Sequence, residues 1–156
     1  MNRSSLAPIA RQMMDSALAN LLRDGYVAFA TMIIGHDNKI TPILVHANNN
    51  MSEREAFGQF LRDLSPRLHA IIIISEAWTL MEEDIDEMAL SIPVSQHPKR
   101  VEGVFVTAQS CYGELLLTKT FMRDADNKPL VHGEVKENWT DSSAICSTGT
   151  FSNLFC

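Results

Sequence analysis

Residues that could do chemistry gather at the end of one apolar run. Ser75-Glu76-Ala77-Trp78 follows Ala70-Ile71-Ile72-Ile73-Ile74, a short, β-branched and uniformly apolar run that is typical of a buried strand. The exit of a central strand is a rigid position beside a loop, where functional groups are often held. There Glu76 could act as a general base or metal ligand, Ser75 as a hydrogen-bond donor and Trp78 as a stacking wall.

A second polar segment, His97-Pro98-Lys99-Arg100-Val101-Glu102, enters the next predicted strand. If the two strands are neighbours, Glu76 and His97 could form an acid–base pair, because a histidine held by a carboxylate is the working part of many such sites. Arg100 could then clamp an anion, and Glu102 would join the binding groups. The alternative is structural: Glu76 would anchor a loop through backbone amides or Arg100, and Arg100 would pair with Glu102.

These two segments resemble a family of uncharacterised bacterial and phage-borne proteins. The likeness lies in an S-E-A-W strand end and a later P-S-x-H-P-x-R-x-E segment, carried here by Ser75–Trp78, Pro93, Ser95, His97-Pro98, Arg100 and Glu102. Val94 stands between Pro93 and Ser95, so the spacing of the proline departs from that pattern. The resemblance covers about a third of the chain and implies a shared fold, but it brings no reaction, ligand or catalytic assignment.

The composition is that of one ordinary globular domain. The chain has 156 residues, of which 46% are hydrophobic and 21% charged, with 7 Gly and 6 Pro. A chain of this length can bury about 70% of its unfolded surface without disulfides or metals. The net charge of -6, with no basic grouping longer than Lys99-Arg100, argues against nucleic-acid binding. No run approaches the roughly 20 apolar residues that cross a bilayer, so we expect no membrane partner.

Cysteine usage and motifs limit the compartment and the chemistry. Cys111, Cys146 and Cys156 are odd in number and widely spaced, as expected for a reducing compartment. Met1 to Arg11 lacks the apolar stretch of a signal peptide, so a cytoplasmic protein is predicted. The sequence contains no H-E-x-x-H, P-loop, G-x-G-x-x-G or G-x-S-x-G motif. We therefore expect no cofactor and no metal site.

Hydrophobic periodicity predicts two amphipathic helices, at about Pro8–Asp24 and Ser52–Leu64. Pro8 suits a first turn and Gly25 a left-handed C-cap. Ser52 and Glu55 form an S-x-x-E capping box for the second helix. Strands are predicted at Tyr26–Ile34, Ile40–Ala47, Ile71–Ile74, Val101–Gln109, Glu114–Met122 and Leu130–Glu137.

The order α-β-β-α-β-β-β-β predicts an α+β fold, in which one mostly antiparallel sheet of five or six strands carries the two helices. Residues 1–140 would form this domain and residues 141–156 a C-terminal tail. Because the tail ends in Phe151, Leu154 and Phe155, we expect it to dock in cis or on a second subunit. The irregular segment Leu80–Gln96, with its acidic run and partly apolar end, is a candidate lid or contact surface.

Two hypotheses about function follow. The first is a non-enzymatic binding or assembly module that forms a homo-oligomer or binds an unknown protein partner, because no reaction motif or cofactor loop is recognisable. The alternative is a small hydrolase or metal-assisted enzyme, with Glu76 and His97 as the acid–base pair, Arg100 as the anion clamp and Trp78 as the pocket wall. The second hypothesis requires these side chains to converge at the end of the strand.

Overall fold

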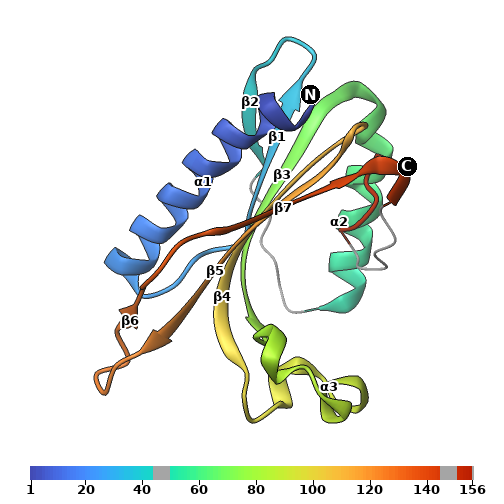
Figure 1. The fold of residues 1–156 in the computed structure, drawn as a ribbon. Helices are drawn as coiled ribbons and strands as arrows, with labels where there is room; N and C mark the ends of the chain where they lie inside the picture. Colours follow the sequence, from blue (N-terminus) through green and yellow to red (C-terminus); the bar gives the residue numbers. More distant parts are fainter. Residues whose placement is uncertain (44–49, 145–150, 156) are drawn as a thin grey trace.

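The structure, a computed structural model, describes residues 1–43, 50–144 and 151–155. Its helices are α1 (Arg3–Asp24), α2 (Met51–Leu64) and α3 (Glu87–Ser91), with short 3-10 turns at Ser65–Arg67, Glu82–Asp84, Val94–Gln96 and Ser142–Ala144. Its strands are β1 (Ala30–Gly35), β2 (Ile40–Ile43), β3 (Leu68–Thr79), β4 (Val101–Ser110), β5 (Gly113–Arg123), β6 (Pro129–Leu130) and β7 (Lys136–Asp141). Figure 1 shows one twisted sheet with α1 and α2 packed on it.

The predicted fold class is confirmed. The strands form one sheet in the order β2-β1-β3-β4-β5-β6, with β7 also paired to β5, and every pairing is antiparallel. Consecutive strands therefore lie beside each other wherever a short turn joins them, as in the β4–β5 hairpin. Among the described residues, no helix is both long and apolar enough to cross a membrane.

β3 lies in the middle of the sheet, and its residues 70–74 are buried on both faces. Ala70, Ile72 and Ile74 pack under α1, while Ile71 and Ile73 face α2. The isoleucine run is thus a buried strand, as predicted, because its alternate side chains fill two different cores. The strand is longer than expected, however, and continues to Thr79, so Ser75–Trp78 belongs to β3 itself and pairs with β4.

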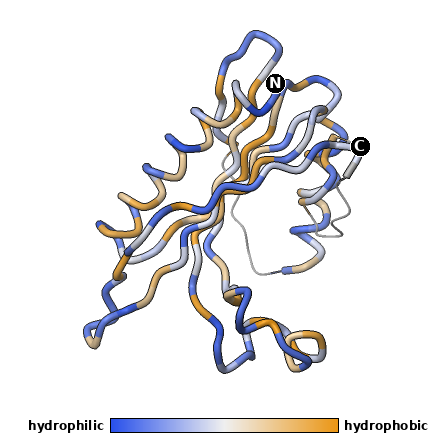
Figure 2. The backbone as a smooth tube through the Cα atoms, in the orientation of Figure 1, coloured by the Kyte–Doolittle hydropathy of each residue, from blue (hydrophilic) through white to orange (hydrophobic). Residues whose placement is uncertain are grey.

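α1 covers one face of the sheet with a stripe of small and large apolar residues, and Figure 2 shows how they alternate with hydrophilic positions along the helix. The fully buried members are Leu6, Ala10, Met14 and Leu21. Gly25 ends the helix at φ +83°, as predicted, and its N–H donates to the Leu21 carbonyl. The helix begins at Arg3, earlier than predicted, because Asn2 caps it. Because the helix begins at Arg3, Pro8 lies inside it and not in its first turn as predicted, and its side chain is exposed.

α2 and residues 151–155 cover part of the other face. Leu61 and Leu154 are buried there, and Phe29, Phe57 and Phe151 meet with ring centroids 5.6–6.4 Å apart. The buried side chain of Gln109 on β4 holds the tail by two hydrogen bonds: it donates to the Phe151 carbonyl and accepts from the Leu154 N–H. The apolar end of the tail therefore docks on its own chain.

Other predicted boundaries also differ from the structure, and the strand predicted at Tyr26–Ile34 is β1, which begins only at Ala30. Asn50, not Ser52, caps α2, because the Asn50 side chain accepts the Ser52 N–H. The strand predicted at Leu130–Glu137 is split into β6 and β7 around Gly133, which has φ +79°. Buried Lys119 donates to the carbonyls of residues 132 and 134, and these carbonyls are therefore turned away from strand pairing. The strand predicted at Ile40–Ala47 is β2 over its first four residues, and residues 44–49 lie outside the described part.

Candidate functional site

Glu76 anchors the connection between α1 and β1. Its Oε2 accepts a hydrogen bond from the Val27 N–H at 2.8 Å, and its Oε1 lies 3.6 Å from a guanidinium nitrogen of Arg123. Arg123 also donates to both carboxylate oxygens of Glu102, at 2.8 and 3.1 Å, and to the Gly25 carbonyl at 3.0 Å. The hydrogen bond to Glu102 is the main reason why the pKa of Arg123 is raised. Two carboxylates and one guanidinium thus fasten the loop to the sheet.

His97 belongs to a separate lobe, which consists of residues 80–100 between β3 and β4 (Figure 1). Its ring is only 1% exposed, and its Nδ1 accepts from the Lys99 N–H at 3.1 Å. The proton therefore resides on Nε2, which donates to Asp86 at 3.2 Å. Asp86 in turn caps α3 by accepting the Ala89 N–H, and this bond, followed by that from His97, lowers the pKa of Asp86. His97 thus holds the lobe together.

The structure does not form the acid–base pair that the sequence predicts. No hydrogen bond joins Glu76 to His97, although both belong to the described part of the chain, and each side chain is bound elsewhere. The prediction of an ion pair between Arg100 and Glu102 is also wrong, because Glu102 pairs with Arg123 instead. Both expectations assumed that side chains near the adjoining ends of β3 and β4 pair with one another. The structure instead pairs them with residues from other segments.

Arg100 instead packs on Trp78, with its guanidinium carbon 4.7 Å from the ring centroid. It also donates to the His97 carbonyl at 3.1 Å, so it connects the lobe to the end of β3. Trp78 remains 44% exposed. A cation over an indole face contributes about 0.5–1 kcal/mol at such an exposed position. The contact between Arg100 and Trp78 therefore connects the lobe to the sheet.

Ser75 lies on the opposite face of β3 from Glu76 and lines a hollow there. This smaller hollow has a volume of about 410 Å³ and lies between α2, the sheet and the C-terminal segment; it is lined by residues that include Phe29, Arg54, Ser75, Thr107, Glu114, Leu116 and Phe151. A larger hollow of about 820 Å³ continues toward the lobe, lined by residues that include Thr79, Leu80, Glu82, Leu116, Thr118, Thr120, Lys136 and Asn138. The two share Leu116, and we call them together the groove.

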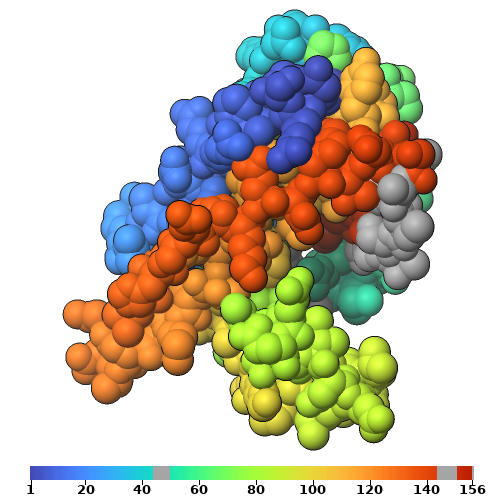
Figure 3. Space-filling model, viewed as in Figure 1, coloured from blue at the N-terminus to red at the C-terminus, as the bar shows by residue number. Residues whose placement is uncertain are grey.

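The groove exists because the two long helices differ in length. α1 has 22 residues and spans about 33 Å, whereas α2 has 14 residues and spans about 21 Å. β3 and β5, with 12 and 11 residues, are about 36–40 Å long. α2 therefore cannot cover its face from end to end. Figure 3 shows the resulting recess between the lobe, in green and yellow, and α2, in teal.

Side chains that face the groove are more polar than those on the other face of the same strand. Along β5, Leu115 and Leu117 are fully buried under α1, while Leu116, Thr118 and Thr120 face the groove and are half-buried. A half-buried row with hydroxyl groups can both exclude water and offer hydrogen bonds. Such a mixture of apolar surface and a few polar groups is typical of binding sites.

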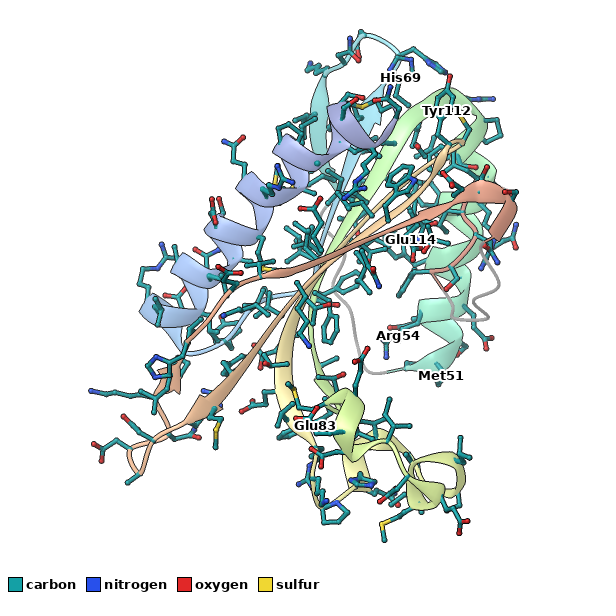
Figure 4. All side chains as sticks on the ribbon, viewed as in Figure 1. Met51, Arg54, His69, Glu83, Tyr112 and Glu114 are labelled. Carbon is teal, nitrogen blue, oxygen red and sulfur yellow. The ribbon has the colours of Figure 1, made fainter. Side chains whose placement is uncertain are left out.

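Glu114 and Arg54 carry the charge in the smaller hollow, and Figure 4 shows Glu114 between the sheet and α2, with Arg54 extending from the first half of α2. Burial raises the pKa of the Glu114 carboxyl. Sequence reasoning missed both residues. The sequence did contain a signal for Glu114, because it stands on the same side of the predicted strand as Leu116, Thr118 and Thr120, and three of these four residues are polar. Within the described residues, no group of three or more His, Cys, Asp or Glu side chains could hold a metal ion.

Comparisons with known proteins give no assignment for this site. No family model matches the chain, and no curated protein or solved structure matches it significantly. The family resemblance carried by the segments 75–78 and 93–102 stays a prediction. The groove is therefore the feature from which a function can be inferred.

Proposed function

We propose that this protein is a non-enzymatic binding module that holds an extended segment of a partner protein in the groove. One observation carries the proposal: among the residues that the structure describes, α1 covers most of one face, whereas the opposite face is covered only over the part that α2 and residues 151–155 reach. The uncovered part is concave and amphipathic. It also lies on rigid central strands, where a binding surface is well defined.

The shape of the groove favours a protein segment over a small molecule. Sites for small ligands enclose most of the ligand surface. Here two hollows of about 410 and 820 Å³ share Leu116, and the described residues enclose them only in part. The larger hollow extends from Thr79 on β3 to Asn138 on β7, across several strands. An extended segment with alternating side chains would fit such a shape.

The enzymatic alternative has less support. It needs Glu76 and His97 to meet, and each of them has its partners in a different part of the fold. The remaining sequence-based expectations, a cytoplasmic location and a homo-oligomer, stay predictions. A second copy of the chain would have to use surfaces other than Phe151 and Leu154, because both already pack on their own chain.

A peptide selection tests the proposal. A phage-displayed library of random peptides would be selected on the purified protein, and the enriched peptides would be titrated against two variants by fluorescence polarisation. Thr118→Trp fills the groove, whereas Thr41→Trp makes the same change on the exposed edge strand β2. We expect Thr118→Trp to weaken binding by about tenfold or more and Thr41→Trp to leave it unchanged. Thr120→Trp serves as a second blocking variant, and circular dichroism checks that each variant is folded.

The proposal fails if no peptide is enriched, or if the enriched peptides bind the blocked and unblocked proteins equally. Native mass spectrometry of the same samples would show whether the chain assembles into multiples of its 17.4 kDa mass. A dimer that dissociates on Thr118→Trp would show that the groove is filled by a second copy and would overturn the partner that we propose.

A further inference from the structure

Glu114 differs from the other half-buried glutamates on the strands of this sheet. Glu76, Glu102 and Glu137 have side chains that are 19–21% exposed, and each lies within 3.6 Å of an arginine nitrogen. These three face α1. Glu114 faces the groove, and it forms no hydrogen bond or ion pair with any residue that the structure describes. A half-buried carboxylate without a partner is unfavourable, since it loses water without gaining a donor.

Arg54 lines the same hollow and is equally unpaired among the residues that the structure describes. Glu114 and Arg54 are also too far apart for an ion pair with each other, although both belong to the smaller hollow. The hollow therefore presents a negative group from β5 and a positive group from α2, and its wall includes the rings of Phe29 and Phe151. A ligand with charges of both signs would satisfy both groups.

We propose that Glu114 selects a basic side chain, lysine or arginine, in the segment that binds to the groove, and that Arg54 takes an acidic group of the same segment. The aromatic wall suits the aliphatic stem of a long basic side chain, which can lie on an apolar surface while its charged end reaches a carboxylate. Burial raises the pKa of this carboxyl and so disfavours its charge, and a cation beside it would offset that cost. This inference rests on the proposed function and names its specificity.

The test is a double-mutant cycle between the protein and a selected peptide. Peptides enriched on the native protein are expected to share a lysine or arginine at one position. Replacement of that residue by norleucine, which keeps the stem and removes the charge, should weaken binding to the native protein about tenfold or more. With Glu114→Gln the same replacement should have an effect of less than about twofold. Glu53→Gln, an exposed carboxylate outside the groove on α2, is the matched control and should keep the full effect.

The outcomes separate this inference from the proposed function. If groove-binding peptides are found but lack a shared basic residue, or if norleucine has the same effect with Glu114→Gln as with the native protein, the role of Glu114 is wrong while the groove remains a binding surface. If no enriched peptide is sensitive to Thr118→Trp, both proposals fall. The role of Arg54 is tested with a selected peptide that has an acidic residue and with a variant in which alanine replaces that residue. If Arg54→Gln weakens binding of the first peptide only, Arg54 binds the acidic group as proposed; equal effects on both peptides would overturn this role.

Discussion

The two faces of the sheet are made by the same strands, yet they are covered to different extents and carry different side chains. On the α1 face, alternate residues of β3, β4 and β5 are mostly apolar and buried; the glutamates on this face are paired with arginines, and buried Lys119 donates to backbone carbonyls. On the α2 face, the residues that the structure describes cover only part of the sheet, and the remainder carries hydroxyl groups and a carboxylate that pairs with none of them. The comparison teaches that the same strands can build a covered core on one face and leave a partly polar recess on the other, which is the surface that we propose for binding.

The largest expected effect tests this division with two neighbouring leucines. Leu117 is fully buried under α1, whereas Leu116 faces the groove and is half-buried. Leu117→Ala should lower the free energy of unfolding by about 3 kcal/mol, since it removes a large side chain from a packed core. Leu116→Ala should lower it by about 1 kcal/mol and instead weaken binding of selected peptides. Urea unfolding measures both; equal losses of stability would contradict the comparison.

A smaller effect is expected at Glu76, on the α1 face. Glu76→Gln should lower the free energy of unfolding by about 1–2 kcal/mol, because it removes the charge that binds Arg123 and weakens the acceptor of the Val27 N–H. Glu83→Gln on the exposed lobe is the matched control and should change stability by less than about 0.5 kcal/mol. If Glu76→Gln left stability unchanged, the anchoring role would be refuted and the enzymatic alternative would regain support.

Much of the fold could be predicted because its signals are local. Gly25 marks the end of α1, and the isoleucine run with its two apolar faces marks a central strand. The sequence could predict that Glu76 anchors a loop, but it could not predict that Arg123 is the charged partner of Glu76. Arg123 reaches it only because the β3–β4 and β4–β5 pairings set the register, and no local pattern encodes that distance.

The groove was predictable in part. The difference in length between the two amphipathic helices and the alternation of Leu116, Thr118 and Thr120 with buried neighbours are both visible in the sequence. What was not visible is where α2 and the tail come to rest. Their position depends on tertiary contacts such as the two hydrogen bonds of Gln109, and these decide which part of the face stays open.

The smallest effect on stability, at Glu114, is the sharpest test of the comparison, because stability and binding should change in opposite directions. Burial raises the pKa of Glu114 above its ordinary value of 4.5, so ionisation of this carboxyl disfavours the folded state. Its contribution to stability is therefore complete below pH 4.5 and is lost as the pH rises through the pKa of the folded protein. Glu114→Gln cannot ionise, so it should be slightly more stable than the native protein at pH 7 and equal to it at pH 3, while it binds basic peptides less tightly. A variant less stable than the native protein at pH 7 would mean that the carboxylate is already satisfied within the fold, and the groove would lose the charge on which its proposed specificity depends.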